Sequence, residues 1–280
     1  MGASYAILNT GSGAWGFEEH AAHLSRAMWL EVRSTPADYV YLLGWDGPES
    51  PLCLDTFIPY ESILLAGDKR RQAVIFEEHQ VATPRTHLLD TPKEVRRFLR
   101  LEHATDWVLK YPTGCGASGH CVLTADSPLA HDWPRPYVVQ EFIRLETPEV
   151  YRLYGIAGET FGWNVRRFPA GVTPSPWVAH ARGARYAEPG PVPAEAEQQA
   201  RAALAATGLL GSFGCVDLLR TEQGRWLVLE VGTDGGFNYV DRDLGIPALE
   251  EEIDRRLARA FWSRVGGRPW GFGDWKRRTA

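Results

Sequence analysis

Two acidic residues, Asp217 and Glu230, lie within two neighbouring apolar runs that we interpret as the strands of a hairpin over residues 213–231. If Gln223 and Gly224 form its two-residue turn, Asp217 faces Glu230 across the hairpin. Directly opposed residues have Cβ atoms roughly 4.5–5.5 Å apart, and like charges at that spacing destabilise a sheet. The pair therefore predicts a shared proton or a bound cation, and carboxylate oxygens favour Mg²⁺. The alternative is a slipped register that leaves one acid at the rim of the sheet.

A glycine-rich segment, residues 114–119, follows Lys110 and points to a second chemistry, phosphate binding. Its spacing matches the GxGxxG pattern of a dinucleotide-binding turn, but such a turn must lead into a helix. Residues 120–123 read instead as another strand, so we predict a hairpin turn whose backbone N–H groups can lie over phosphates. Lys110 suits a phosphate, although a lone lysine before a turn is more often a solvated residue. A Rossmann-type dehydrogenase would require a helix directly after residue 119.

The composition argues against several classes of function. The chain has 280 residues, with 30 Lys plus Arg, 35 Asp plus Glu and a formal net charge of −5. The charges are scattered, whereas a nucleic-acid or anionic-membrane binder needs a basic face, so we expect neither partner. The apolar runs are far shorter than the ~20 residues of a membrane helix. The four cysteines make no CxxC pair and no zinc spacing, so we expect free thiols in a cytoplasmic protein.

The segment before these motifs predicts a small α/β unit over residues 1–65. A strand at residues 5–9, a helix with apolar residues at helical spacing over 17–28 and a strand at 39–43 follow one another. Two helix starts come next. Asp68 is a plausible N-cap, and Thr91-Pro92-Lys93-Glu94 is a capping box with proline at the first helical position.

From residue 106 onward the pattern is mostly strand. Strands are expected at residues 107–111, 120–124, 137–143, 150–157, 161–168, 213–220 and 225–231. A proline-rich stretch covers residues 169–193, a helix follows as far as Gly208, and a last helix runs from about 247 to 265. We expect residues 266–280 to form an extended tail.

In their order and spacing these segments resemble the ATP-grasp superfamily of ligases. The resemblance rests on Asp68-Lys69, on VATPRT at residues 81–86, on VLKYP at 108–112 with the glycine loop, on VQEFI at 139–143, and on GCVD and LEV at 214–217 and 229–231. It implies an α/β (α+β) ATP-grasp domain over residues 66–265. A central hairpin-bearing subdomain would span 66–135 and a C-terminal antiparallel-sheet subdomain 136–265, with ATP between them.

The resemblance also implies which residues contact ATP. They are Lys69, Lys110, Gly114, Gly116, Ser118 and Gly119 at the phosphates, Gln140 or Glu141 at the adenine amino group, Phe142 and Ile143 at the hinge backbone, and Glu149, with Glu146 as the alternative, at the ribose.

A second group of residues would serve the chemical step. It consists of Arg166 or Arg167 at an acyl-phosphate, and Asp217, Glu230 and either Asn238 or Asp234 at Mg²⁺. The family has an asparagine two residues after the second metal-binding acid, but this chain has Gly232 there. We therefore expect Asn238 or Asp234 to substitute, and the number of Mg²⁺ ions stays open.

The expected activity is ATP-dependent joining of a carboxylate to an amine, through an acyl-phosphate and with release of ADP and phosphate. The substrates would be small molecules or peptides, and the resemblance suggests a homodimer. Two alternatives on the same fold are a phosphotransferase, which would release a stable phosphorylated product, and a non-catalytic nucleotide-binding protein.

Overall fold

The computed structural model describes residues 3–9, 17–44, 55–114, 116–233 and 237–266. The chain divides into two compact units, residues 1–62 with 247–280, and residues 63–246. Helix α7 (Ala248–Arg264) therefore belongs to the first unit, whereas the sequence assigns it to the domain over 66–265. The physical reason is aromatic packing, because Phe261 of α7 contacts the rings of Tyr39 and Phe57.

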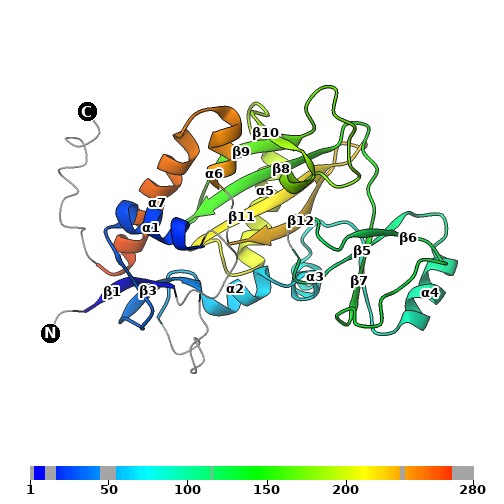
Figure 1. The fold of residues 1–280 in the computed structure, drawn as a ribbon, viewed down its shortest axis with the longest axis horizontal. Helices are drawn as coiled ribbons and strands as arrows, with labels where there is room; N and C mark the ends of the chain where they lie inside the picture. The colour runs from blue at the N-terminus through cyan, green and yellow to red at the C-terminus, as the bar shows by residue number, and fades with distance from the viewer. Residues whose placement is uncertain (1–2, 10–16, 45–54, 115, 234–236, 267–280) are drawn as a thin grey trace. The chain divides into compact units, whose positions relative to one another are not determined.

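The first unit contains a three-stranded parallel sheet in the order β2 (Glu31–Arg33), β1 (Tyr5–Asn9), β3 (Tyr39–Gly44). Helix α1 (Phe17–Met28) packs against this sheet and against α7, as Figure 1 shows. The sequence predicts β1, α1 and β3 correctly, while β2 was not predicted. Helix α2 (Tyr60–Ala66) spans the division between the units.

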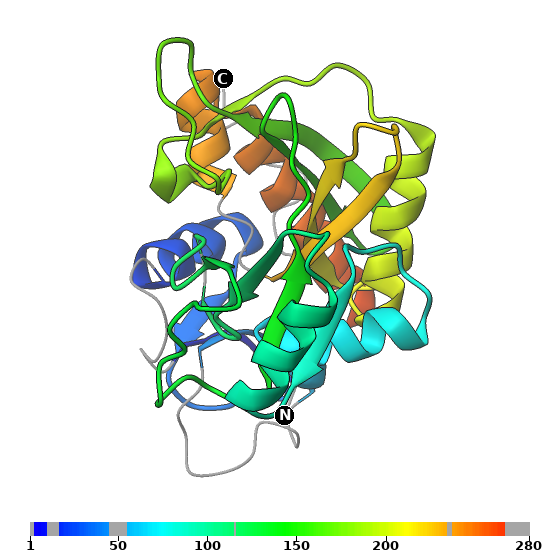
Figure 2. The same ribbon diagram turned by 90° about the vertical axis from the view of Figure 1, so that its right-hand side faces the viewer.

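The second unit begins with a four-stranded antiparallel sheet. Its order is β4 (Thr86–Leu89), β7 (Tyr137–Glu141), β5 (Trp107–Lys110), β6 (Cys121–Leu123). Strands β5 and β6 flank the glycine-rich segment, so this segment joins two antiparallel strands and no helix follows it directly. Helix α4 (Pro92–Leu101) covers one face of the sheet, as Figure 2 shows, and buries Val95 and Leu99 against Trp107 and Leu109.

A five-stranded antiparallel sheet forms the rest of the second unit. Its order is β10 (Arg185–Ala187), β9 (Glu159–Arg167), β8 (Glu149–Ile156), β11 (Phe213–Arg220), β12 (Trp226–Gly232). Helix α5 (Ala194–Ala206) packs on β8, β11 and β12 through small buried residues such as Ala196, Ala200 and Ala203. Helix α6 (Phe237–Leu244), which the sequence did not predict, contacts β10.

Two helix caps position the elements that carry site residues. Asp68 accepts a hydrogen bond from the backbone N–H of Arg70 and begins α3 (Lys69–Glu78). The Thr91 hydroxyl accepts from the N–H of Glu94, whose carboxylate accepts from the N–H of Thr91, so the predicted capping box begins α4. Among the described residues, no helix combines the length and apolar character that crossing a membrane requires.

Candidate functional site

A cavity in the second unit encloses about 890 Å³ of empty space, part of it open to solvent. Of the residues that the sequence predicts for the site, those that line the cavity are Lys69, Lys110, Gly114, Gly116, Gln140, Glu141, Phe142, Ile143, Arg166, Asp217 and Glu230. The structure thus gathers in one place residues that are up to about 160 positions apart in the chain.

One wall of the cavity is the segment that continues from β7 into Phe142 and Ile143. The backbone N–H of Glu141 donates to the carbonyl of Arg85 and that of Phe142 donates to the carbonyl of Asp106, each at 2.8 Å. These bonds hold the segment in an extended form. The ring of Trp177 meets Phe142 edge-on, with ring centroids 5.6 Å apart. The wall therefore suits a planar ring, and Trp177 is a lining residue that sequence reasoning missed because it lies in the proline-rich stretch.

Gln140 and Glu141 both line the cavity, and each has a partner. The side-chain amide of Gln140 donates to the hydroxyl of Thr86 at 2.9 Å. The carboxylate of Glu141 pairs with Nε of Arg85 at 3.1 Å. The choice between them as the adenine contact therefore stays open.

The glycine-rich hairpin covers another side of the cavity. Gly114 and Gly116 line it, while Ser118 and Gly119 are not among the lining residues. Gly119 has a φ of +70°, and a Cβ there would lie 2.9 Å from Cβ of Tyr111, so this position requires glycine to close the turn. His120 follows the turn and lines the cavity. Burial first, and then the charge of Lys110, lower the pKa of His120 to about 4, so its ring is neutral near pH 7.

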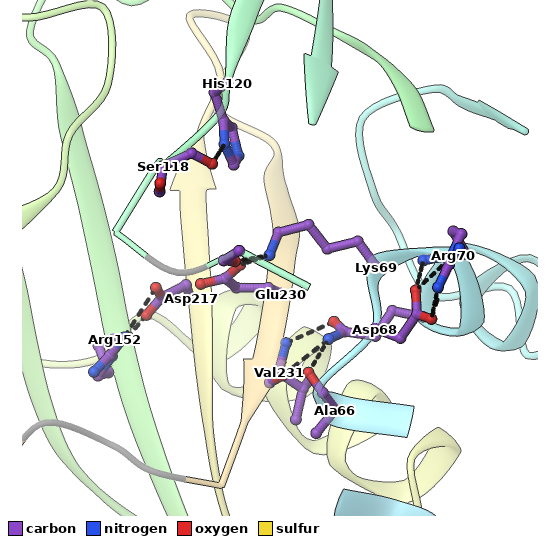
Figure 3. A network of polar contacts seen from close by, with 12 residues as sticks. Ala66, Asp68, Lys69, Arg70, Ser118, His120, Arg152, Asp217, Glu230 and Val231 are labelled. Atoms are coloured by element: carbon purple, nitrogen blue, oxygen red, sulfur yellow. Dashed lines mark hydrogen bonds and ion pairs between the residues drawn. The ribbon is translucent and has the colours of Figure 1, made fainter. Parts of the chain in front are cut away.

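Two lysines approach the cavity from different elements. Lys69, at the start of α3, donates through Nζ to the carbonyl of Gly114 at 2.6 Å and lies 3.5 Å from a carboxylate oxygen of Glu230 (Figure 3). Lys110, at the end of β5, is half-buried, and desolvation is the largest of the effects that lower its pKa to about 8. Both lysines therefore lie where they can meet an anionic ligand.

The acid pair forms in the register that the sequence predicts, since Asp217 of β11 opposes Glu230 of β12. The predicted two-residue turn is wrong, because Thr221 donates its N–H to the carbonyl of Arg225 and three residues lie between them. Leu218 opposes Val228, which leaves Leu229 without a partner in the ladder. This bulge offsets the longer turn and restores the predicted pairing. It also lets two consecutive residues, Leu229 and Glu230, line the cavity.

Asp217 is bound by guanidinium groups where the sequence predicts a metal ion. Arg152 donates from Nε to Oδ1 at 2.7 Å and from Nη2 to Oδ2 at 3.0 Å, and Arg166 donates from Nη2 to the same Oδ2. Figure 3 shows Arg152 facing the carboxylate. Burial alone would raise the pKa of Asp217, but the two arginines outweigh it and hold that pKa below its ordinary value.

The implied metal fits this donor set poorly. No group of three or more His, Cys, Asp or Glu able to hold a metal occurs among the residues that the structure describes. Gly232 stands at the position of the family's third ligand. Asp234 and the side chain of Asn238, the predicted substitutes, lie outside the described part of the structure.

Three further predicted residues, Glu149, its alternative Glu146 and Arg167, do not line the cavity. Glu149 accepts a hydrogen bond from the hydroxyl of Tyr151 and pairs with Nε of Arg167 at 3.3 Å. Side chains alternate along a strand, so Glu149 and Tyr151 lie on the opposite face of β8 from Val150 and Arg152. Glu149 and its alternative, Glu146, both line a separate hollow, and the ribose contact stays a prediction. Of the two arginine candidates, only Arg166 lines the cavity.

The structure resembles solved structures of ligases along nearly its whole length. D-cycloserine synthetase DcsG matches with a TM-score of 0.64 and 17% identity, over 94% of this chain and 100% of that chain. The ATP-grasp ligase PsnB, complexed with a minimal precursor, matches with a TM-score of 0.67 and 14% identity, over 94% and 100%. D-alanyl-alanine synthetase A from Vibrio cholerae matches with a TM-score of 0.67 and 13% identity, over 95% and 98%.

These likenesses establish the fold. No model of a protein family matches the sequence, and the comparison with curated proteins gives no match. The chain has the ATP-grasp fold, as the resemblance of its motifs implies.

Proposed function

We propose that this protein is an ATP-dependent ligase that activates a carboxylate as an acyl-phosphate and joins it to an amine. The observation that carries the proposal is one cavity that combines an aromatic wall, at Phe142 and Trp177, with the cations Lys69, Lys110 and Arg166. An adenine ring suits the first feature and a polyphosphate suits the second. The ATP-grasp fold of the chain supports the same conclusion.

In the first step a carboxylate oxygen of the acid attacks the γ-phosphorus of ATP, the bond to the β-phosphate oxygen breaks, and ADP leaves. Negative charge on the transferring phosphoryl group is neutralised by Lys69, Lys110 and Arg166, and hydrogen bonds hold Lys69 and Arg166 in place before the reaction begins. The glycine-rich hairpin next to Lys69 covers the phosphates and limits the entry of water.

In the second step the amine nitrogen attacks the carbonyl carbon of the acyl-phosphate. The carbon–oxygen bond to phosphate breaks, inorganic phosphate leaves, and the nitrogen loses a proton as the amide forms. Arg166 lies at the cavity where it can bind the departing phosphate oxygens. Mg²⁺ is proposed here as a companion of the nucleotide, on the model of the structure of PsnB complexed with Mg and ADP.

The substrate class rests on the relatives in structure. PsnB binds a precursor peptide, and D-cycloserine synthetase and D-alanyl-alanine synthetase are named for small amino-acid-like products. We therefore propose an amino acid or a peptide as the source of the carboxylate and of the amine. A homodimer stays a prediction.

The test is to incubate the protein with ATP and MgCl₂ and a panel of amino-acid and peptide acids, each with and without amines, and to measure ADP and phosphate. Amine-dependent release of both products supports a ligase. ADP with a stable phosphorylated product and no need for an amine identifies the phosphotransferase alternative. Arg166→Gln should abolish release, while Arg220→Gln, which removes an exposed charge at the end of β11, should not. Unchanged background hydrolysis in Arg166→Gln would instead favour a non-catalytic nucleotide-binding protein.

A further inference from the structure

Four charged or polar residues form one row across the five-stranded sheet. Asn164 of β9 opposes Arg152 of β8, Arg152 opposes Asp217 of β11, and Asp217 opposes Glu230 of β12. Asp217 therefore has a cation on one neighbouring strand and an acid on the other. This arrangement follows from strand register, so it is fixed by the backbone of the sheet.

The Arg152–Asp217 contact has the geometry of a two-point ion pair. Nε and Nη2 of Arg152 donate to the two different oxygens of the carboxylate, at 2.7 and 3.0 Å. Both side chains are nearly buried, with exposed fractions of 11% and 5%. A planar guanidinium matches a carboxylate in this way, and burial strengthens the pair because little water competes for it.

A second guanidinium makes the charge balance at Asp217 positive. Arg166 donates to Oδ2, so two guanidinium groups share one carboxylate. Lys69 is the cation beside Glu230, and the half-buried Lys110 lines the same cavity. A divalent cation placed on Asp217 would be repelled by both arginines, because like charges in a buried site interact strongly.

Arg166 keeps one donor for a ligand. Its Nε is buried and has no hydrogen-bond partner among the residues that the structure describes. The side chain is about nine-tenths buried and lines the cavity, with Cζ 5.7 Å from the ring centre of Tyr186. A buried N–H without a partner is costly, and an oxygen of an anionic ligand would satisfy it.

We infer that Asp217, itself held by Arg152, is the counter-ion that orients Arg166 toward an anion, so that guanidinium charge stands where the family pattern places a metal ion. The inference rests on the proposed function, because the anion is the phosphate chain of the nucleotide or the acyl-phosphate. Arg152 is then a positioning residue, since it acts through Asp217, and Glu230 is the acid left to meet a metal carried by the nucleotide. This chain accordingly needs fewer metal ions for nucleotide binding than its family pattern implies.

The test uses the full chain, ADP and Mn²⁺ as a spectroscopic substitute for Mg²⁺. Electron paramagnetic resonance counts the Mn²⁺ ions bound per chain at saturating ADP, and we expect no more than one. Calorimetry gives the dissociation constant of ADP in EDTA divided by that in MgCl₂, a ratio that increases as the metal contributes more to binding. Arg152→Gln should increase this ratio by about tenfold or more, because it frees oxygens of Asp217 for the metal. Arg220→Gln removes a charge from an exposed position at the end of β11, the strand that carries Asp217, and should leave the ratio unchanged.

Each outcome has a distinct meaning. Two Mn²⁺ ions per wild-type chain, or an unchanged ratio in a folded Arg152→Gln, would overturn the inference while the proposed function stands. Absence of ADP binding with and without metal would overturn the proposed function itself. If Arg152→Gln fails to fold, the Mn²⁺ count of the wild-type protein decides alone.

Discussion

Gln72 joins the helix that carries Lys69 to the strand that carries Glu230. Its side-chain amide accepts from the N–H of Val231 at 2.9 Å and donates to the carbonyl of Val231 at 3.1 Å, so it extends the ladder of β12 at the edge of the sheet. It also donates to the carbonyl of Ala66 at 2.7 Å. Figure 3 shows two of its partners, Val231 and Ala66, near the Lys69–Glu230 pair. We predict that Gln72→Leu lowers both the stability of the protein and its affinity for nucleotide.

The size of the stability loss in Gln72→Leu depends on which backbone groups lose their hydrogen-bond partner. Val231 is 1% exposed, so its N–H and its carbonyl would both stay buried without a hydrogen bond. Ala66 is partly exposed, and water can replace the amide there. Two buried orphan groups cost roughly 1–3 kcal/mol each. Burial of the introduced leucine side chain offsets about 1 kcal/mol of this cost. The net loss of unfolding free energy is therefore about 1–5 kcal/mol.

Urea unfolding followed by circular dichroism measures this loss, and calorimetry with ADP measures the affinity. Gln199→Leu is the matched control, because within the described residues Gln199 accepts one, longer hydrogen bond, from the N–H of Ala82 at 3.3 Å. It should cost less than about 1 kcal/mol. A Gln72→Leu protein that unfolds within 1 kcal/mol of the wild type, at an equal m-value, would refute the assignment of Gln72 as a buried link.

Three further predictions follow from single residues. Burial lowers the pKa of Lys110 to about 8, so ADP affinity measured by calorimetry should fall as the pH rises through 8, and Lys110→Arg should remove that fall. Burial raises the pKa of Asp254 from 3.8 to about 6. The stability that the protonated carboxyl contributes is therefore complete below pH 3.8 and is lost as the pH rises through 6. Asp254→Asn should reduce this pH-dependent decrease in the unfolding free energy, measured by urea unfolding. Gly119→Ala places a Cβ 2.9 Å from Tyr111 at a positive φ and should lower the unfolding free energy by roughly 1–3 kcal/mol, more than Gly158→Ala, which meets no atom within 4 Å. A smaller loss for Gly119→Ala would contradict the close approach.

Features set by neighbouring residues could be predicted from the sequence. The Asp68 cap and the Thr91 capping box use partners within three residues, so a local motif determines them. The hairpin around the glycine-rich segment was predictable because a short apolar run, Cys121–Leu123, resumes one residue after Gly119. The short strands β4 and β10 were missed because pairing with distant strands stabilises them more than their own four or three residues do.

The acid pair was predicted correctly through a premise that was wrong. The turn holds three residues, with Gly224 at a φ of +83°, and the bulge at Leu229 cancels the extra residue. Sequence periodicity finds which residues share a face, but it does not reveal a bulge. The pairing of Asp217 with Glu230 survived because a one-residue slip would have exchanged the faces of every residue beyond it.

The partners of Asp217 could not be predicted, since register across separate strands decides them. Arg152 and Asp217 are 65 residues apart and meet only because β8 and β11 are neighbours in the sheet. One signal was present, because Arg152 is a charge inside the largely apolar run 150–156, where an unpaired charge would be costly. The position of Glu149 could not be predicted for a similar reason. Side-chain alternation places Glu149 on the same face of β8 as Tyr151, but no local signal indicates which face of the strand borders the cavity.

The energetics of this buried cluster support a role in binding. A buried ion pair contributes little net stability, because removing two charges from water costs about as much as their attraction returns. A cluster of two arginines on one aspartate, with a buried donor still vacant, is less favourable still. Apolar residues of similar volume would give a more stable sheet, so stability alone does not account for it. An anion that completes the charge balance and accepts from Nε of Arg166 does account for it, and the phosphoryl transfer proposed above would bring such an anion to this cavity.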